Sequence, residues 1–134
     1  MNWKIGACAA VALSGFWMMC AQDPKNFTGT VTNLKENSDG KIAHYRFDPG
    51  ARSKWHSHEG GQIILQEEGV GRVQIKGGPV IELHTGDTTY AGPGVWHWHG
   101  ASPEKGGVQF NVSRGGITWG DPVTEKEFTT KPKK

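Results

Sequence analysis

The sequence predicts an all-β fold in which short strands close into a barrel or a two-sheet jelly roll. From Phe27 onward no long stretch has the apolar periodicity of a helix, whereas short extended segments recur between turn signals. The chain has 134 residues, of which 20 are glycine and 7 are proline, and 35% are hydrophobic. This composition is typical of short strands with many turns, and the length fits one compact domain.

The first half of the chain supplies four expected strands. Residues 28–34 and 42–47 are separated by the turn sequence Asn-Ser-Asp-Gly, and Asp-Pro-Gly follows the second of them. Residues 62–67 and 71–76 come next and end at Gly-Gly-Pro. These turn residues tolerate the dihedral angles that reverse a chain, so each extended segment has a defined end.

The second half supplies four more. Residues 80–83 and 88–90 precede the turn sequence Gly-Pro-Gly, residues 97–101 follow it, and Lys-Gly-Gly precedes residues 108–112. So many strands in so short a chain are too many for one open sheet, which favours closure. We expect the tail from Thr124 to form one helical turn at most, with no core to join.

The N-terminal segment has the composition of a secretory signal. Lys4 gives it a positive start, and residues 5–21 contain no charged residue. We expect cleavage after Ala21, which predicts a signal peptide over residues 1–21 and an exported protein, periplasmic or secreted, from a bacterium. A retained anchor and lipidation at Cys20 are alternatives, but the uncharged run is short for a membrane span.

The expected mature chain, residues 22–134, has a simple chemical inventory. Both cysteines, Cys8 and Cys20, lie in the segment to be removed, so neither a disulfide nor a thiol nucleophile remains. Cleavage removes only Lys4 from the 15 basic residues and none of the 13 acidic ones. A nearly neutral body with a small basic tail gives no electrostatic footprint for nucleic acid, and no membrane contact is expected after cleavage.

Two His-x-His pairs are the candidate chemical centre. Side chains alternate between the faces of a strand, so His56 and His58 point the same way, and Gln62 joins them if the intervening glycines keep the alternation. His97 and His99 share one face of a later strand. Either pair alone could be exposed or merely hydrogen-bonded, but two pairs beside glycine or proline turns, in a chain with 6 histidines, favour a metal site.

The other histidines, His44 and His84, lack such companions and are expected to be ordinary strand residues. Three tryptophans near the pairs, Trp55, Trp96 and Trp98, are expected to pack rather than to stack on a substrate. The charged residues just before the first pair, Arg52 among them, are expected at a solvated strand edge.

The spacing resembles two motifs of the cupin superfamily. The first motif has its counterpart in five residues, with glutamine in place of the usual glutamate: Gly50, His56, His58, Gln62 and Gly69. The second resembles four residues, with one extra residue before the proline: Gly86, Pro93, Gly94 and His97. The resemblance implies a cupin double-stranded β-helix, which is a jelly-roll barrel, as a single domain over residues 22–134 with a short C-terminal tail. It also implies metal ligation by His56, His58 and His97, with Gln62 in the carboxylate's place.

The chain is more closely similar to small bacterial cupins that act as manganese-dependent hydroxynitrile lyases. The similarity spans residues 27–128 and includes the stretches "PGARSKWHSHEGGQ", "PGVWHWHGA" and "ITWGDPVTEKEF". In that subfamily glutamine is the normal fourth ligand, and His99 corresponds to an active-site histidine beside the ligands. One departure is Gln109, which stands where those lyases have a further histidine.

The resemblance and the neutral ligand set predict a metal-dependent lyase of hydroxynitrile-lyase type. Imidazoles and an amide leave the charge of a divalent ion uncompensated, which makes it a stronger Lewis acid. Mn²⁺ is the expected ion, with Fe²⁺ next and Zn²⁺ less favoured because zinc prefers four ligands.

Roles in such a site can be assigned residue by residue. His99 is the candidate base, because a neutral imidazole beside a bound hydroxyl has a pKa in a useful range; a hydrogen-bonding role is the alternative. Gln109 shares strand parity with two pocket candidates and is expected to orient substrate. The expected substrate pocket has five members: Ala43, Tyr45, Phe47, Asn111 and Ser113.

Two other functions stay open: an iron-dependent dioxygenase, and a non-catalytic periplasmic protein that binds a ligand or a metal. In each case the partner is a small molecule. The resemblance also implies a homodimer or a higher homo-oligomer.

Overall fold

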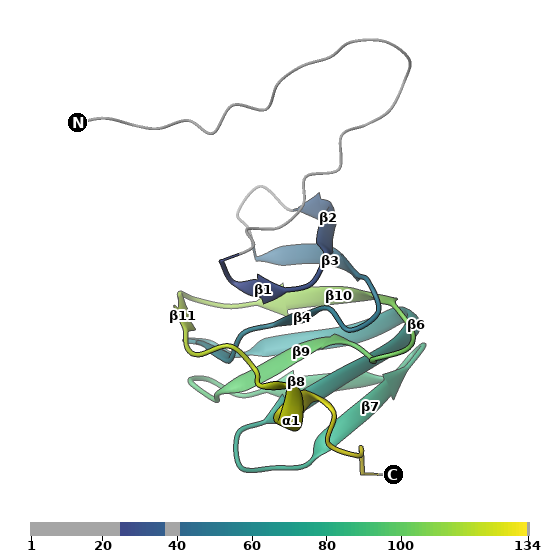
Figure 1. Cartoon of the computed structure of the whole chain (residues 1–134). Helices are drawn as coiled ribbons and strands as arrows, with labels where there is room; N and C mark the ends of the chain where they lie inside the picture. The colour runs from purple at the N-terminus through teal and green to yellow at the C-terminus, as the bar shows by residue number, and fades with distance from the viewer. Residues whose placement is uncertain (1–24, 37–40, 134) are drawn as a thin grey trace, which may run out of the picture.

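The computed structural model describes residues 25–36 and 41–133, and the expected signal peptide over residues 1–21 lies outside them. This part of the chain forms a series of strands and one short helix (Figure 1). The strands are β1 Phe27–Thr28, β2 Val31–Glu36, β3 Ile42–Phe47, β4 Arg52–Ser53, β5 His56–His58, β6 Gln62–Ile75, β7 Val80–His84, β8 Thr88–Ala91, β9 His97–Ala101, β10 Gly107–Ser113 and β11 Ile117–Trp119; the helix is α1 Glu125–Phe128. The described residues include no helix long and apolar enough to cross a membrane.

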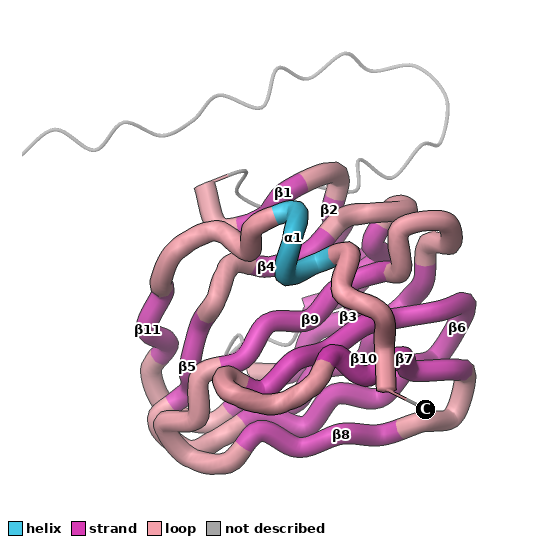
Figure 2. The backbone as a smooth tube through the Cα atoms, turned by 60° about the horizontal axis from the view of Figure 1, so that its bottom comes forward, coloured by secondary structure: helices cyan, strands magenta, loops and turns pink. Residues whose placement is uncertain are grey.

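The strands pair in antiparallel fashion and form a nearly closed barrel (Figure 2). Their order is β1-β4-β9-β6-β10-β3-β2, with β5 and β11 paired to each other and β5 also to β9. The first half of β6 pairs with β8 and β10, and its second half pairs with β7 and β9. The all-β jelly-roll prediction is confirmed.

Strand β6 corrects one predicted boundary. Residues 62–67 and 71–76 are not two strands, because Gln62–Ile75 is continuous over 14 residues. Val108 and Gln109 of β10 face Glu68 and Gln66 of β6, which leaves one residue of β6 without a partner at this point. Such a bulge bends a strand without ending it, so β6 passes from one side of the barrel to the other with no turn.

Two short strands escaped the sequence prediction. β4 and β11 have two and three residues, too few to show an alternating pattern, whereas β5 is the extended segment expected at the first His-x-His pair. β5 is held from both sides, because His56 pairs with Trp119 of β11 and with His97 of β9. The first His-x-His pair therefore lies on a strand whose ends are fixed by partners distant in sequence.

The C-terminal tail does join the core, so the expectation that it has no core is wrong. Thr124 caps α1, and its hydroxyl accepts from the main-chain N–H of Glu127. Phe128, 3% exposed, packs with buried apolar residues that include Trp98 of β9 and Trp55. The helix packs on the outside of the barrel near β4 and β9 (Figure 2). Trp98 is thus a packing residue, as expected.

Arg52 contradicts the expected solvated edge and explains how the tail is held. Its side chain is buried, its guanidinium donates to the main-chain oxygen of Val123 at 3.2 Å and to the Glu125 carboxylate, and it lies 4.2 Å above the Phe128 ring. Arg72 donates to the main-chain oxygen of Phe128 at 2.8 Å. Charge-assisted hydrogen bonds from a buried guanidinium are strong, so the two arginines fix the chain that supplies the acceptors.

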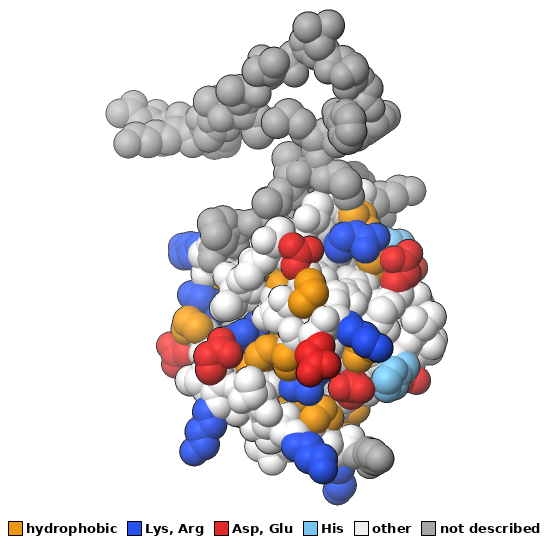
Figure 3. Space-filling model, turned by 45° about the vertical axis from the view of Figure 1, so that its right-hand side comes forward, with side chains coloured by type: hydrophobic (Ala, Val, Ile, Leu, Met, Phe, Trp, Pro, Cys, Tyr) orange, Lys and Arg blue, Asp and Glu red, His pale blue; other side chains and the backbone are white. Residues whose placement is uncertain are grey.

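The surface and the interior differ sharply in polarity. On the face shown in Figure 3, basic and acidic side chains are interspersed, as the near-neutral composition suggests. Inside the barrel, an unusual number of histidine, glutamine and asparagine side chains are buried: His56, His58, Gln62, Gln66, His97, His99, Gln109 and Asn111. Buried polar groups of this kind need partners, so their contacts define the candidate site.

Candidate metal centre

Four imidazoles from two strands meet inside the barrel. β5 supplies His56 and His58, and β9 supplies His97 and His99. The ring centroids of His56 and His97 lie 4.3 Å apart, and those of His56 and His58 lie 5.3 Å apart. The His99 ring is 6.1 Å from that of His97. The alternation that predicted two converging pairs is therefore present in the structure.

Main-chain carbonyls orient two of the rings. Nδ1 of His56 lies 2.9 Å from the main-chain oxygen of Lys54, and Nδ1 of His97 lies 3.0 Å from that of Val95. A carbonyl oxygen only accepts, so each Nδ1 carries the proton and donates it. In the neutral ring, Nε2 then presents a lone pair to the interior.

The amide of Gln62 faces the same point. Its nitrogen donates to Oγ of Ser113 at 3.0 Å, which turns its oxygen inward. That oxygen lies 2.7 Å from Nε2 of His97 and 3.4 Å from Nε2 of His56. Three electron-pair donors thus face one another with no hydrogen between them, and such an arrangement fits a cation.

His58 offers a second indication. Its Nε2 is buried and has no hydrogen-bond partner among the described residues. A buried nitrogen without a partner costs free energy, and a metal ion is one partner that would satisfy it. The residues present therefore fit a divalent ion held by nitrogen and amide oxygen atoms.

Burial keeps all four imidazoles neutral. Desolvation lowers the pKa of His58 to about 4 and that of His99 to about 3, with the nearby His97 adding to both effects. Desolvation also lowers the pKa of His97, and it lowers that of His56 well below 6.5. Neutral imidazole is the form that binds metals. Its lowered pKa makes His99 a weak base, whereas the sequence interpretation places that pKa in a useful range.

The expected ligand set and the tightest histidine group differ by one residue. Ligand atoms of His56, His97 and His99 all lie within 4.8 Å of one another. His58, an expected ligand, lies outside this group, and its Nε2 is the atom without a partner. The structure thus places Gln62 against two of the three expected histidine ligands and brings in His99, which was expected only beside them.

A small cavity opens next to these groups. Its volume is about 270 Å³, and it is lined by Lys41, Ala43, Tyr45, His58, Gln62, Asn111, Ser113, Gly115, Ile117 and Trp119. Four of the expected pocket residues are in this lining. The fifth, Phe47, is not, because it is 1% exposed in an apolar cluster with Val31, Ala51 and Ala101.

β11 contributes two lining residues that the sequence did not assign, Ile117 and Trp119. The Trp119 ring lies 5.0 Å from that of His56. The stretch "ITWGDPVTEKEF" marked this region as similar to the lyases, but its strand is too short to predict. Asn111 adds a polar feature, because its Oδ1 is buried and receives no hydrogen bond from the described part of the chain.

Gln109 does not line the cavity, contrary to the expectation that it orients substrate. It is buried behind His99, and its oxygen accepts from Nδ1 of His99 at 2.8 Å. Its nitrogen donates to Gln66, a residue that sequence reasoning did not single out. Gln66 comes opposite Gln109 only because of the bulge in β6.

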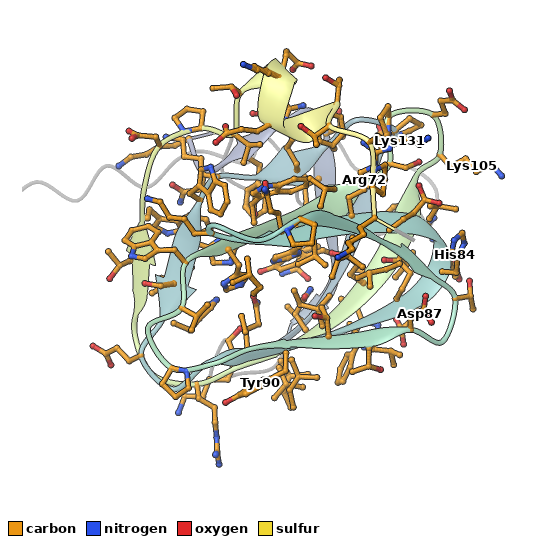
Figure 4. All side chains as sticks on the ribbon, turned by 90° about the horizontal axis from the view of Figure 1, so that it is seen from below. Arg72, His84, Asp87, Tyr90, Lys105 and Lys131 are labelled. Atoms are coloured by element: carbon orange, nitrogen blue, oxygen red, sulfur yellow. The ribbon has the colours of Figure 1, made fainter. Side chains whose placement is uncertain are left out.

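The remaining histidines and a second, larger hollow lie away from the centre. His44 pairs with Glu67 at 3.0 Å and His84 with Glu82 at 3.3 Å. Figure 4 shows His84 and Tyr90 on the outside of the barrel. Tyr90 belongs to a hollow of about 610 Å³, in which Gln62 is the only group from the centre. None of the four imidazoles is among its lining residues.

Comparison with known proteins agrees with this architecture. The Cupin_2 family, the cupin domain, matches residues 43–111. A protein of Granulicella tundricola named (R)-mandelonitrile lyase is 36% identical over 111 residues, which cover 76% of this chain and 85% of that protein. The matched region includes both strands that supply the histidines.

Solved structures give the same result for the fold. A cupin-like protein of Thermotoga maritima has a TM-score of 0.74 and 36% identity, covering 84% of this chain and 92% of its own. A cupin-2 domain of Rhodospirillum rubrum has a TM-score of 0.57 at 16% identity, covering 89% and 85%; at that identity only the fold is shared. With a barrel of this topology, histidines on two paired strands and a family match over half its length, the chain belongs to the cupin family.

Proposed function

We propose that this cupin is a metal-dependent lyase that cleaves small α-hydroxynitriles into an aldehyde and cyanide. The observation that carries the proposal is the set of neutral electron-pair donors, His56, His97 and Gln62, that converge beside a small cavity. The 36% identical relative named (R)-mandelonitrile lyase supports the substrate class.

We propose Mn²⁺ as the ion, held by His56, His58, His97 and the amide oxygen of Gln62. A mixed set of nitrogen and oxygen donors suits Mn²⁺ or Fe²⁺ better than Zn²⁺. When bound, the ion supplies a Lewis acid that makes a substrate hydroxyl more acidic, and the neutral ligands leave its charge uncompensated.

His99 would receive the hydroxyl proton at Nε2. Its Nδ1 donates to Gln109, so Nε2 has the free lone pair. With a pKa of about 3 the ring is a weak base, which restricts it to an acidified hydroxyl. As the proton leaves, the electron pair of the O–H bond forms the second carbonyl bond, the carbon–carbon bond breaks, and cyanide departs with the electron pair of that broken bond and takes up the proton from His99.

The cavity would bind the rest of the substrate. Trp119, Ile117 and Tyr45 give it an apolar and aromatic lining, which suits a small aryl or alkyl group. Oδ1 of Asn111 has no donor among the described residues, so it would accept a hydrogen from substrate or water. Polar groups among apolar walls are what orient a small ligand.

The test is cyanide release from mandelonitrile by the Mn²⁺-loaded protein. We expect release that His97→Ala abolishes and that the matched control His84→Ala, at an exposed histidine, leaves unchanged. Equal release by wild type and His97→Ala would overturn the proposal. Oxygen uptake with a phenolic or enediol substrate after Fe²⁺ loading, without cyanide release, would favour the dioxygenase alternative.

A further inference from the structure

We propose that Gln66 and Gln109 act as one unit, the amide pair, that fixes the ring orientation and the tautomer of His99. The two glutamines are positioning residues, since neither lines the cavity. The proposed function enters only in the catalytic use of His99, and the inference deepens that function. The hydrogen-bond geometry that supports it is independent of the reaction.

The hydrogen bonds run in one direction through the barrel. Nε2 of Gln66 donates to the main-chain oxygen of Glu68 at 2.7 Å, so its Oε1 faces Gln109. Nε2 of Gln109 donates to that Oε1 at 2.9 Å and to the main-chain oxygen of Gly100 at 3.1 Å. Because carbonyl oxygens only accept, the two main-chain groups determine which way each amide points.

This direction leaves one tautomer for His99. Oε1 of Gln109 lies 2.8 Å from Nδ1 of His99 and has no hydrogen to give. Nδ1 therefore carries the proton, and Nε2 carries the lone pair. The same state is imposed on His56 and His97 by the main-chain oxygens of Lys54 and Val95. The tautomer of His99 is thus fixed by the side chains of the amide pair, whereas the tautomers of His56 and His97 are fixed by main-chain oxygens.

Solvent cannot replace the pair. Gln66 is 0% exposed, Gln109 is 1% and His99 is 2%. A buried donor or acceptor that loses its partner finds no water to take its place. The orientation of His99 consequently depends on this particular set of contacts.

Two glycines leave the space that the pair occupies. A Cβ at Gly71 would overlap Oε1 of Gln66 and approach Nε2 of Gln109 to 2.7 Å, and a Cβ at Gly107 would overlap Nε2 of Gln66. Neither glycine has a positive φ. A Cβ at Gly107 would also lie 2.6 Å from the main-chain oxygen of Glu68, whereas the atoms nearest a Cβ at Gly71 all belong to the side chains of the amide pair. At Gly71 a larger residue would therefore displace the amide pair.

The experiment measures imidazole nitrogen chemical shifts in the metal-free protein at neutral pH, without substrate. The variants are Gln109→Met, Gln66→Met and Gly71→Ala. The matched control is Gln74→Met, another glutamine of β6, whose amide contacts Gly78 and the Trp98 indole instead. His56 and His97 serve as references within each protein.

We expect wild-type His99 to be protonated at Nδ1 alone. Each of the three variants should lose this single tautomer, while His56 and His97 keep theirs and Gln74→Met changes nothing. An Nε2-protonated His99 in the wild type would overturn the proposal even if a variant failed to fold. The proposal would also be overturned if His99 kept the wild-type tautomer in any of the three variants that folds. Nitrogen chemical-shift changes of equal size at His56, His97 and His99 would overturn it as well. Because no metal or substrate is present, this result and the lyase test can fail separately.

Discussion

The side-chain oxygen of Gln62 lies 2.7 Å from Nε2 of His97, and neither atom has a hydrogen to offer the other. The hydrogen bond from Gln62 to Ser113 fixes the amide, and the carbonyl of Val95 fixes the imidazole. Burial lowers the pKa of His97, which opposes the protonation that would relieve the contact. Gln62 and His97 are therefore preorganised to bind a cation.

Replacing Gln62 separates its two contributions, an oxygen donor and the absence of charge. Gln62→Leu removes the donor and should weaken Mn²⁺ binding by roughly 100-fold, the upper end of what loss of a group that orients a metal ligand costs. Gln62→Glu keeps the donor but cancels one unit of the ion's charge. We expect tighter Mn²⁺ binding and about tenfold slower cyanide release, which is ~1.4 kcal/mol in the barrier.

In the metal-free protein, Gln62→Glu should also raise the pKa of His97, because a carboxylate would face its Nε2. Calorimetry, cyanide assays and a nitrogen titration check the three effects, with Gln74→Glu on the same strand as the control. A Gln62→Glu protein with the wild-type rate and the wild-type His97 pKa would contradict the charge argument.

Mn²⁺ should stabilise the fold, because the donors converge only in the folded chain. Binding to the native state adds about 2.7 kcal/mol when free Mn²⁺ is roughly 100-fold above Kd. Differential scanning calorimetry with Mn²⁺ and with chelator should show a higher Tm in the presence of the ion. His56→Ala should lose this difference, and His84→Ala should retain it. A difference that survives in His56→Ala would place the ion elsewhere.

Periodicity was sufficient to predict the faces of the histidines. Alternation in a strand depends only on local geometry, so His56 with His58, and His97 with His99, could be assigned to common faces without a partner strand. Contacts that depend on the register between strands could not be predicted from the sequence. Gln66 meets Gln109 because β6 has a bulge, and nothing in the local sequence specifies which residue of the partner strand a bulge will face.

The tail was misjudged for a related reason. α1 has only four residues, so its own periodicity says nothing about burial. Phe128 is buried because Arg52, far away in sequence, holds the preceding chain against the barrel. The charged residue that looked like a solvated edge is thus the one that makes the apolar tail part of the core.

Phe128→Ala should destabilise the protein by about 3–5 kcal/mol, the usual cost of removing a buried aromatic ring. The variant loses packing against Trp98 and the guanidinium of Arg52 above the ring. Urea unfolding measures the change. Lys126→Ala, at an exposed position of the same helix, should stay within about 0.5 kcal/mol of the wild type. Equal effects of the two substitutions would show that the tail does not contribute to the core.

Acid should destabilise the metal-free protein through its buried histidines. The unfolded chain protonates them near pH 6.5, whereas folding lowers the pKa of His58 to about 4 and that of His99 to about 3. Between these values the unfolded state binds more protons, so stability is complete above pH 6.5 and falls as the pH drops toward 4 and then 3. Each group contributes up to ~1.4 kcal/mol per pH unit.

Urea midpoints of the metal-free protein at a series of pH values between about 7.5 and 4.5 measure this slope, the upper limit lying above the unfolded-state pKa. His58→Asn removes one histidine whose pKa is lower in the folded state than in the unfolded state, so the stability of this variant should fall less steeply with decreasing pH than that of the wild type. A flat profile would mean that the imidazoles are accessible to protons in the folded state. The lowered pKa values have a second consequence: protons compete with a metal only near the folded-state pKa, so a site of these histidines should hold its ion at pH values where an exposed histidine site has already lost it.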